Sequence, residues 1–152
     1  QQLLASGSLC AVGTDHAPHP LEEKVRPYAK APSGFPSVDL LLPLIVAVRD
    51  RFGLRLDALL RSVTSGPALE FGLEGKGRIA PGADADLVVV DPARERRVEE
   101  SELPSKSKWS PYAGWPLRAF PRDVYLRGNL VWSQGNALGE PLGRPLFPRT
   151  AR

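Results

Sequence analysis

The sequence has few of the residues that bind metals or form covalent cross-links. Its 152 residues include two histidines, one cysteine and no methionine. A single cysteine excludes an internal disulfide, and Cys10 stands in the apolar run Leu9–Val12, where we expect a small buried side chain rather than a nucleophile. No apolar run approaches the roughly 20 residues that a membrane span requires, and no signal peptide is visible. We therefore expect a protein of the reducing cytoplasm without a membrane partner.

The absence of methionine leaves the chain without an initiator residue. It opens with Gln1-Gln2-Leu3-Leu4, which reads as the end of a helix that leads into a strand. We therefore expect the chain to be the C-terminal part of a longer protein.

Positive charge is present but dispersed. The formal net charge is +3, and the only dense basic run, Arg94 to Arg97, is followed at once by Glu99 and Glu100. Nucleic-acid binding needs clustered positive charge, so we expect no nucleic-acid partner.

The first half of the chain predicts one strand, a long loop and several helices. Leu9–Gly13 has the pattern of a short buried strand, and residues 14–36 form a loop rich in proline and charge. A loop of this length within a domain is usually functional. Ser37 is a plausible N-cap for the first helix, and Gly72 a plausible end for the last. The predicted helices cover residues 38–52, 56–63 and 67–72.

The second half predicts mainly strands and turns. Asp86–Asp91 is typical of a strand, and Val124–Trp132 is typical of a hairpin whose turn lies at Gly128-Asn129. Between them, Lys106–Trp109 is expected to be a solvated loop. Three aromatic residues are expected to pack between the two halves: Tyr112, Trp115 and Phe120.

The segment Thr14-Asp15-His16-Ala17-Pro18-His19 contains both histidines and a carboxylate. Asp15 follows the predicted strand, and catalytic groups of barrel enzymes lie at the C-terminal ends of strands. His16 and His19 can each ligate zinc or donate to a substrate carboxylate. A loop-capping aspartate and surface histidines are the alternatives. Zinc generally takes three or four protein ligands, so this segment alone does not predict a complete metal site.

Ser33 and Gly34 stand near the end of the long loop, just before the first long helix. Free backbone N–H groups ahead of a helix favour an anion there. The alternative is a plain turn with a capping serine.

Several segments, in order, resemble dihydroorotases, which are cyclic amidohydrolases. The resemblance covers about residues 1–135. The Gly82–Asp91 segment identifies only the amidohydrolase superfamily, whereas Asp15–His19 together with Ser105–Tyr112 points to dihydroorotase, with allantoinase as the close relative. The matching segments are Gly13–His19, Glu22–Lys24, Ala31–Gly34, Ser65–Ala68, Phe71–Leu73, Lys76–Ile79, Gly82–Asp91, Ser105-Lys106 and Ser110–Trp115.

The resemblance implies an α/β fold that is the C-terminal fragment of a (β/α)8 TIM-type barrel with part of a flanking β-sandwich. Residues 1–72 would be the last strand, the substrate loop and the helices of the barrel. Residues 73–135 would belong to the β-sandwich, and residues 136–152 would be a proline-rich extension. A complete barrel takes roughly 250 residues, which agrees with a fragment.

The resemblance also implies a reaction, the reversible zinc-dependent hydrolysis of (S)-dihydroorotate to N-carbamoyl-L-aspartate in pyrimidine biosynthesis. In the family, the position that matches Asp15 binds one of one or two zinc ions and acts as the general base. The position that matches His19 contacts the substrate carboxylate, and backbone atoms at Ser33 and Gly34 line the pyrimidine pocket. His16 matches the motif without a direct substrate role.

The family's other metal ligands have no counterpart in residues 1–152, so we expect the chain alone to be inactive. A second copy, as a homodimer, and aspartate transcarbamoylase are the expected protein partners. Two alternatives remain. One is an allantoinase or hydantoinase-type cyclic amidohydrolase, and the other is a non-catalytic dihydroorotase-like scaffold of aspartate transcarbamoylase.

Overall fold

The computed structural model describes residue 6 and residues 9–148, and this part of the chain divides into two compact units. The sheet unit contains the described residues up to Val12, Val48–Asp91 and the residues from Pro121 onward. The loop unit contains Gly13–Ala47 and Pro92–Phe120. Both units combine segments from each side of Gly72, so the predicted division into residues 1–72, 73–135 and 136–152 stays a prediction.

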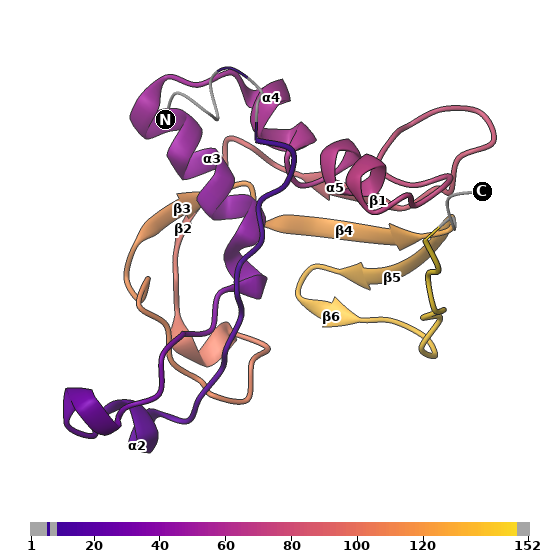
Figure 1. Ribbon diagram of the computed structural model, residues 1–152. Coiled ribbons are helices and arrows are strands. Elements are labelled where there is room, and N and C mark those ends of the chain that lie inside the picture. The colour runs from indigo at the N-terminus through magenta and orange to yellow at the C-terminus, as the bar shows by residue number, and fades with distance from the viewer. Residues whose placement is uncertain (1–5, 7–8, 149–152) are drawn as a thin grey trace. The chain divides into compact units, whose positions relative to one another are not determined.

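The sheet unit is built on four antiparallel strands in the order β1-β4-β5-β6 (Figure 1). The predicted strand at Asp86–Asp91 is confirmed as β1. The predicted hairpin is also confirmed, but its turn is Arg127-Gly128, one residue earlier than expected. Both turn residues have positive φ, 48° and 81°, as a tight two-residue hairpin turn requires. The strands are β1 Leu87–Val90, β4 Pro121–Leu126, β5 Asn129–Ser133 and β6 Asn136–Ala137.

The predicted helices are present with small changes at their ends. The first begins with a 3-10 turn, η2 (Val38–Leu40), and continues as α3 (Leu41–Phe52). The second is α4 (Leu56–Arg61) and the third is α5 (Ser65–Glu70). No helix in the described part of the chain is long and apolar enough to cross a membrane.

The predicted strand at Leu9–Gly13 is wrong. A strand requires a ladder of hydrogen bonds to a neighbouring strand, and none is formed here within the described residues. Instead, the Val12 N–H donates to the Ser62 carbonyl at 2.8 Å. Without a sheet around it, Cys10 is exposed, in contrast to the buried side chain expected. The backbone still passes tightly over α5, because a Cβ on Gly66 would lie 1.9 Å from the Cys10 carbonyl oxygen.

The loop unit has a small core that the polar composition of residues 92–121 did not predict. Two short antiparallel strands, β2 (Glu95–Arg97) and β3 (Pro116–Arg118), carry part of it. Its remaining elements are short: α2 (Leu21–Lys24), η1 (Tyr28–Lys30) and η3 (Glu100–Glu102). The buried cluster comprises Leu40, Val98, Leu103 and Leu117, with Leu44, Ala47, Tyr112 and Phe120 packed against it.

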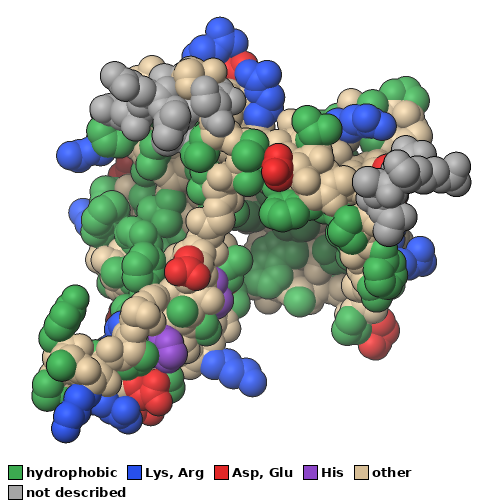
Figure 2. Space-filling model, in the orientation of Figure 1, with side chains coloured by type: hydrophobic (Ala, Val, Ile, Leu, Met, Phe, Trp, Pro, Cys, Tyr) green, Lys and Arg blue, Asp and Glu red, His purple; other side chains and the backbone are tan. Residues whose placement is uncertain are grey.

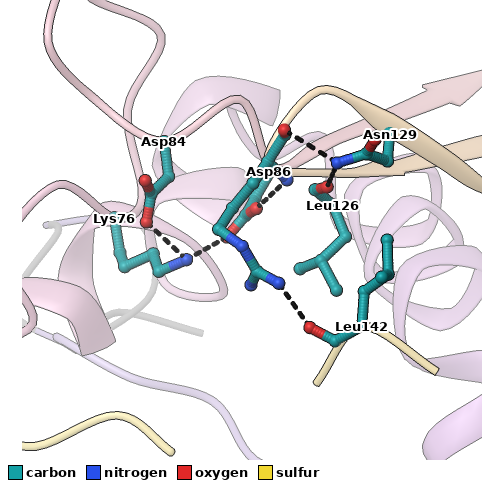
Figure 3. Close-up of polar contacts among 7 residues, drawn as sticks. Lys76, Asp84, Asp86, Leu126, Asn129 and Leu142 are labelled. Atoms are coloured by element: carbon teal, nitrogen blue, oxygen red, sulfur yellow. Dashed lines mark hydrogen bonds and ion pairs between the residues drawn. The ribbon is translucent and has the colours of Figure 1, made fainter. Parts of the chain in front are cut away.

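A charged cluster fixes the glycine-rich loop that precedes β1 (Figure 3). The Lys76 side chain is 12% exposed, and its Nζ contacts Asp84 at 2.8 Å and also contacts Asp86. The Arg127 N–H at the hairpin turn donates to Asp86 Oδ1 at 2.8 Å. Hydrogen bonds from Lys76, first to Asp84 and then to Asp86, raise the pKa of the lysine. Partial burial acts to raise the pKa of Asp86, but the bonds from Lys76 and Arg127 outweigh it and leave that pKa below its ordinary value.

Candidate active-site segment

Asp15 lies in the loop unit with its carboxylate exposed. Its φ is +48°, on the left-handed side that non-glycine residues rarely adopt, although aspartate is among the more tolerant. The carboxylate makes no hydrogen bond or ion pair within the described residues. It is therefore available to a ligand or a proton.

The backbone around Asp15 is joined to the segment that precedes α3. Residues His16 and Phe35 form a parallel bridge, and the Ala17 N–H donates to the Phe35 carbonyl at 3.1 Å. Gly34 has φ of +90°, and a Cβ there would lie 2.5 Å from the Ala17 Cβ, so only glycine permits this approach. The structure thus brings the Asp15 segment and Gly34 together, and their roles in one site stay a prediction.

The prediction that the Ser37 side chain caps the helix is wrong, because it forms no capping hydrogen bond. Its Oγ donates to the Thr14 carbonyl at 3.0 Å. The acceptor at this helix start is His16 Nδ1, which receives the N–H groups of Ser37 at 3.0 Å and Val38 at 3.1 Å. No local sequence pattern predicts this role of the His16 imidazole, since its partners are more than 20 residues away along the chain.

The Lys24 side chain binds the backbone on both sides of Ser33. The lysine Nζ donates to the Pro32 carbonyl at 2.6 Å and to the Gly34 carbonyl at 2.9 Å. The N–H groups of Ser33 and Gly34 have no hydrogen-bond partner among the described residues. Two backbone donors thus remain available where the sequence predicted contacts to a ligand.

His19 is partly exposed and is held through its main chain. Its carbonyl accepts a hydrogen bond from Trp109 Nε1 at 2.7 Å, and its N–H donates to the Ala17 carbonyl at 2.9 Å. His19 Nδ1 lies 3.3 Å from Glu23 Oε2, with side chains 36% and 34% exposed. Histidine and acidic side chains reach the surface of the same face (Figure 2). Trp109 was predicted to lie in a solvated loop, and the expectation missed this contact because it spans 90 residues.

The residues at hand do not fit a complete metal site. Within the described part of the chain, no group of three or more histidine, cysteine, aspartate or glutamate side chains could hold an ion. Asp15 offers one carboxylate, and the described residues place it in no group of three possible ligands, whereas zinc sites generally use three or four.

Comparison with known proteins agrees with the fold and with the motifs. Residues 1–131 match the sequence model of the amidohydrolase family, and the chain therefore belongs to that family. Among curated proteins, it is 42% identical over 129 residues to a dihydroorotase of Halobacterium salinarum, covering 85% of this chain and 30% of that protein. It is 36% identical over 146 residues to a dihydroorotase of Methanosarcina acetivorans, covering 95% of this chain and 31% of the relative.

Solved structures with a similar fold include hydantoinases. An L-hydantoinase (dihydropyrimidinase) from Arthrobacter aurescens superposes with a TM-score of 0.84 at 31% identity, over 91% of this chain and 32% of that one. A D-hydantoinase (dihydropyrimidinase) from Thermus sp. gives 0.83 at 28% identity, over 91% and 31%. The chain thus spans about a third of the length of the relatives that it matches.

Proposed function

We propose that this chain is part of a dihydroorotase, which hydrolyses the ring amide of (S)-dihydroorotate reversibly to N-carbamoyl-L-aspartate in pyrimidine biosynthesis. The observation that carries the proposal is the identity of 34 to 42% to several curated dihydroorotases over most of the chain. The Asp15–His19 segment supports it, because this segment lies against Gly34 and leaves the expected polar groups available.

The proposed roles follow from which polar groups are already occupied. Asp15 has an exposed, unpaired carboxylate that can take a proton from the attacking water and deliver it to the departing amide nitrogen. The Glu23 carboxylate beside His19 accepts the Nδ1–H, so the imidazolium form of His19 would donate its Nε2–H to the substrate carboxylate. The N–H groups of Ser33 and Gly34 would donate to the ring on its other side.

We further propose zinc as the cofactor and Asp15 as one of its ligands, within a (β/α)8 barrel of which this chain supplies the last part. Zinc would act as a Lewis acid on the ring carbonyl. The described residues supply no complete ligand set, so the other ligands would come from outside them. A homodimer or an assembly with aspartate transcarbamoylase is the proposed oligomeric context.

Hydantoinase activity is the second candidate, favoured by the two hydantoinase structures with TM-scores of 0.83 and 0.84. The substrates differ in one useful respect, because dihydroorotate carries a ring carboxylate that unsubstituted hydantoin and dihydrouracil lack. A site built around His19 for a carboxylate should therefore separate the two functions.

The test is a substrate panel on the protein expressed from the full reading frame that contains this chain, loaded with zinc. We expect turnover of dihydroorotate, formation of dihydroorotate from N-carbamoyl-L-aspartate, and a much lower kcat/KM on allantoin, hydantoin and dihydrouracil. Preference for a ring without a carboxylate would replace the first candidate with the second. Absence of turnover on the whole panel would contradict both and support a non-catalytic scaffold.

A further inference from the structure

We infer that His16 is a positioning residue, which holds the segment from Ser33 to Val38 in place beside Asp15. The inference rests on the proposed function, because it concerns how the two sides of that site are kept in register. His16 is given no contact with substrate.

The His16 ring is bound through one of its two nitrogens. His16 Nδ1 accepts two backbone N–H groups, from Ser37 at 3.0 Å and from Val38 at 3.1 Å. An imidazole nitrogen that accepts must carry a lone pair, so in the neutral ring the proton is on Nε2. Two donors that converge on one nitrogen also fix the orientation of the ring. Nδ1 is therefore not available to a metal or a substrate.

The same two bonds supply an acceptor to the backbone N–H groups at the start of η2. The first N–H groups of a helix have no partner within the helix itself. No side-chain cap is formed by Ser37, whose hydroxyl is used on the Thr14 carbonyl. Because His16 provides the acceptor for this end of η2, its loss would leave two backbone donors without a protein partner.

The main chain of His16 is also joined to the segment before the helix. His16 pairs with Phe35, and the following residue donates its N–H to the Phe35 carbonyl at 3.1 Å. His16 therefore contacts the segment after Gly34 at two places: its backbone pairs with Phe35, and its ring accepts from Ser37 and Val38. Asp15 is the residue immediately before this double attachment, so its backbone is fixed with it.

The consequence concerns the reaction geometry. Asp15 would move the proton while the Ser33 and Gly34 N–H groups would hold the ring, and both sets of groups are tied to His16. A displacement of about 1 Å between reacting groups can cost roughly 100-fold in rate. Removing the His16 contacts should thus lower kcat and change KM, although His16 touches no reacting atom.

Three substitutions separate this role from a general loss of stability. Asn places its Oδ1 where His places Nδ1, so His16→Asn keeps an acceptor for the two N–H groups. His16→Gln moves the acceptor to the position of Nε2, and His16→Leu removes it. Leu59→Val is the control for stability, since Leu59 is 1% exposed in α4 of the sheet unit and belongs to neither the Asp15 segment nor the Ser33–Val38 segment.

The first readout does not need activity. Hydrogen–deuterium exchange is followed by mass spectrometry in the full-length protein, on peptides that cover Phe35–Leu40. We expect exchange at the Ser37 and Val38 amides to be at least about tenfold faster in His16→Leu and His16→Gln, and close to wild type in His16→Asn. Unchanged exchange in His16→Leu would overturn the inference, and so would protection restored by Gln instead of Asn.

The second readout is kcat and KM for dihydroorotate, normalised to the folded fraction. We expect kcat/KM to fall by about tenfold or more in the Leu and Gln variants and to recover to within about threefold of wild type in His16→Asn. Leu59→Val should lower the melting temperature and leave kcat and KM in place. Faster exchange with unchanged kinetics would overturn the positioning role. A wild-type protein that turns over no substrate would contradict the proposed function, and the exchange pattern would then decide by itself whether His16 holds the segment.

Discussion

The loop unit and the sheet unit use aspartate in opposite ways. In the sheet unit, Asp86 accepts bonds from Lys76 and from the Arg127 N–H, and its charge is used to hold the glycine-rich loop against a hairpin turn. In the loop unit, Asp15 is exposed and has no bonded partner in the described part of the chain. Its surroundings are joined by bonds that do not involve this carboxylate: backbone amides, a serine hydroxyl, the His16 ring and the Lys24 ammonium, which donates to backbone carbonyls.

The difference shows how a stable fold can keep a reactive charge available. A carboxylate that is fixed by a cation loses basicity, because the charged form is stabilised. The segment that carries Asp15 is held through other groups, and its carboxylate has no bonded partner among the described residues. The comparison predicts that substitutions in the sheet unit change stability and that substitutions in the Asp15 segment change activity.

The largest effect is expected for Asp15→Asn in the full-length protein. A general base typically contributes about 100- to 10,000-fold, so kcat for dihydroorotate should fall by roughly 1,000-fold. The melting temperature should not fall, because no bond within the described residues is lost. Steady-state kinetics and calorimetry check both statements. Asp57→Asn, which removes the same charge at an exposed pair with Arg55, should leave kcat in place.

The second effect is expected for His19→Asn. A hydrogen bond to a charged group contributes about 1.5–3 kcal/mol, so KM for dihydroorotate should rise by roughly 10- to 100-fold. Any residual turnover of dihydrouracil should keep its KM, since that ring has no carboxylate. Equal losses on both rings, measured by initial rates, would remove His19 from the carboxylate contact and would weaken the case for dihydroorotate over hydantoin.

The third effect is on stability alone. Lys76→Met leaves Asp84 and Asp86 facing each other without their shared cation, and all three side chains are partly exposed. We expect the free energy of unfolding to fall by about 1–2 kcal/mol. Urea unfolding measures this, and kcat per folded molecule should be unchanged. A loss of kcat at constant stability would contradict the separation between the units.

The smallest effect is on the pH dependence of stability. Asp86 has a lowered pKa in the fold, so its contribution is fully present above its unfolded value of about 3.9 and is lost as the pH falls through the lower folded value. Asp86→Asn should therefore be less stable than wild type at pH 7 and should lose less stability on acidification below about pH 4. Asp123 also has a lowered pKa, caused first by Ser133 and then by Arg122, so part of the acid dependence should remain. Urea unfolding at several pH values tests the difference between the two proteins.

Local patterns in the sequence predicted most of the regular structure. The helical spacing of residues 38–52 and the apolar run at Val88–Val90 were sufficient, because each element's own residues carry the signal. The predicted hairpin turn was wrong by one residue, because Arg127 has a positive φ and arginine is not a residue type that predicts one. Leu9–Gly13 has the composition of a strand but no strand beside it in the described residues. A ladder depends on a partner, and composition alone does not supply one.

The polar contacts of the site were harder to predict than its residues. The motif drew attention to Asp15 and His19, whose site roles stay predictions. The bond from Trp109 to His19 and the bonds from His16 to the next helix join distant segments, and neither hydrophobic periodicity nor spacing reports such pairs. The core of the loop unit was missed for a related reason. Val98, Leu103 and Leu117 are isolated among polar residues and form a cluster only after the chain has folded.

The positive φ of Asp15 has a consequence for selection. Glycine adopts this backbone region freely and asparagine tolerates it, whereas a non-glycine residue held there costs of order 1 kcal/mol. A library randomised at position 15 and selected only for heat resistance should therefore become enriched in glycine and asparagine. The same library, selected for growth that depends on the protein catalysing the reaction, should return aspartate. Retention of aspartate under the first selection would mean that the residue serves the fold, and its replacement would mean that the residue is kept for chemistry at some expense of stability.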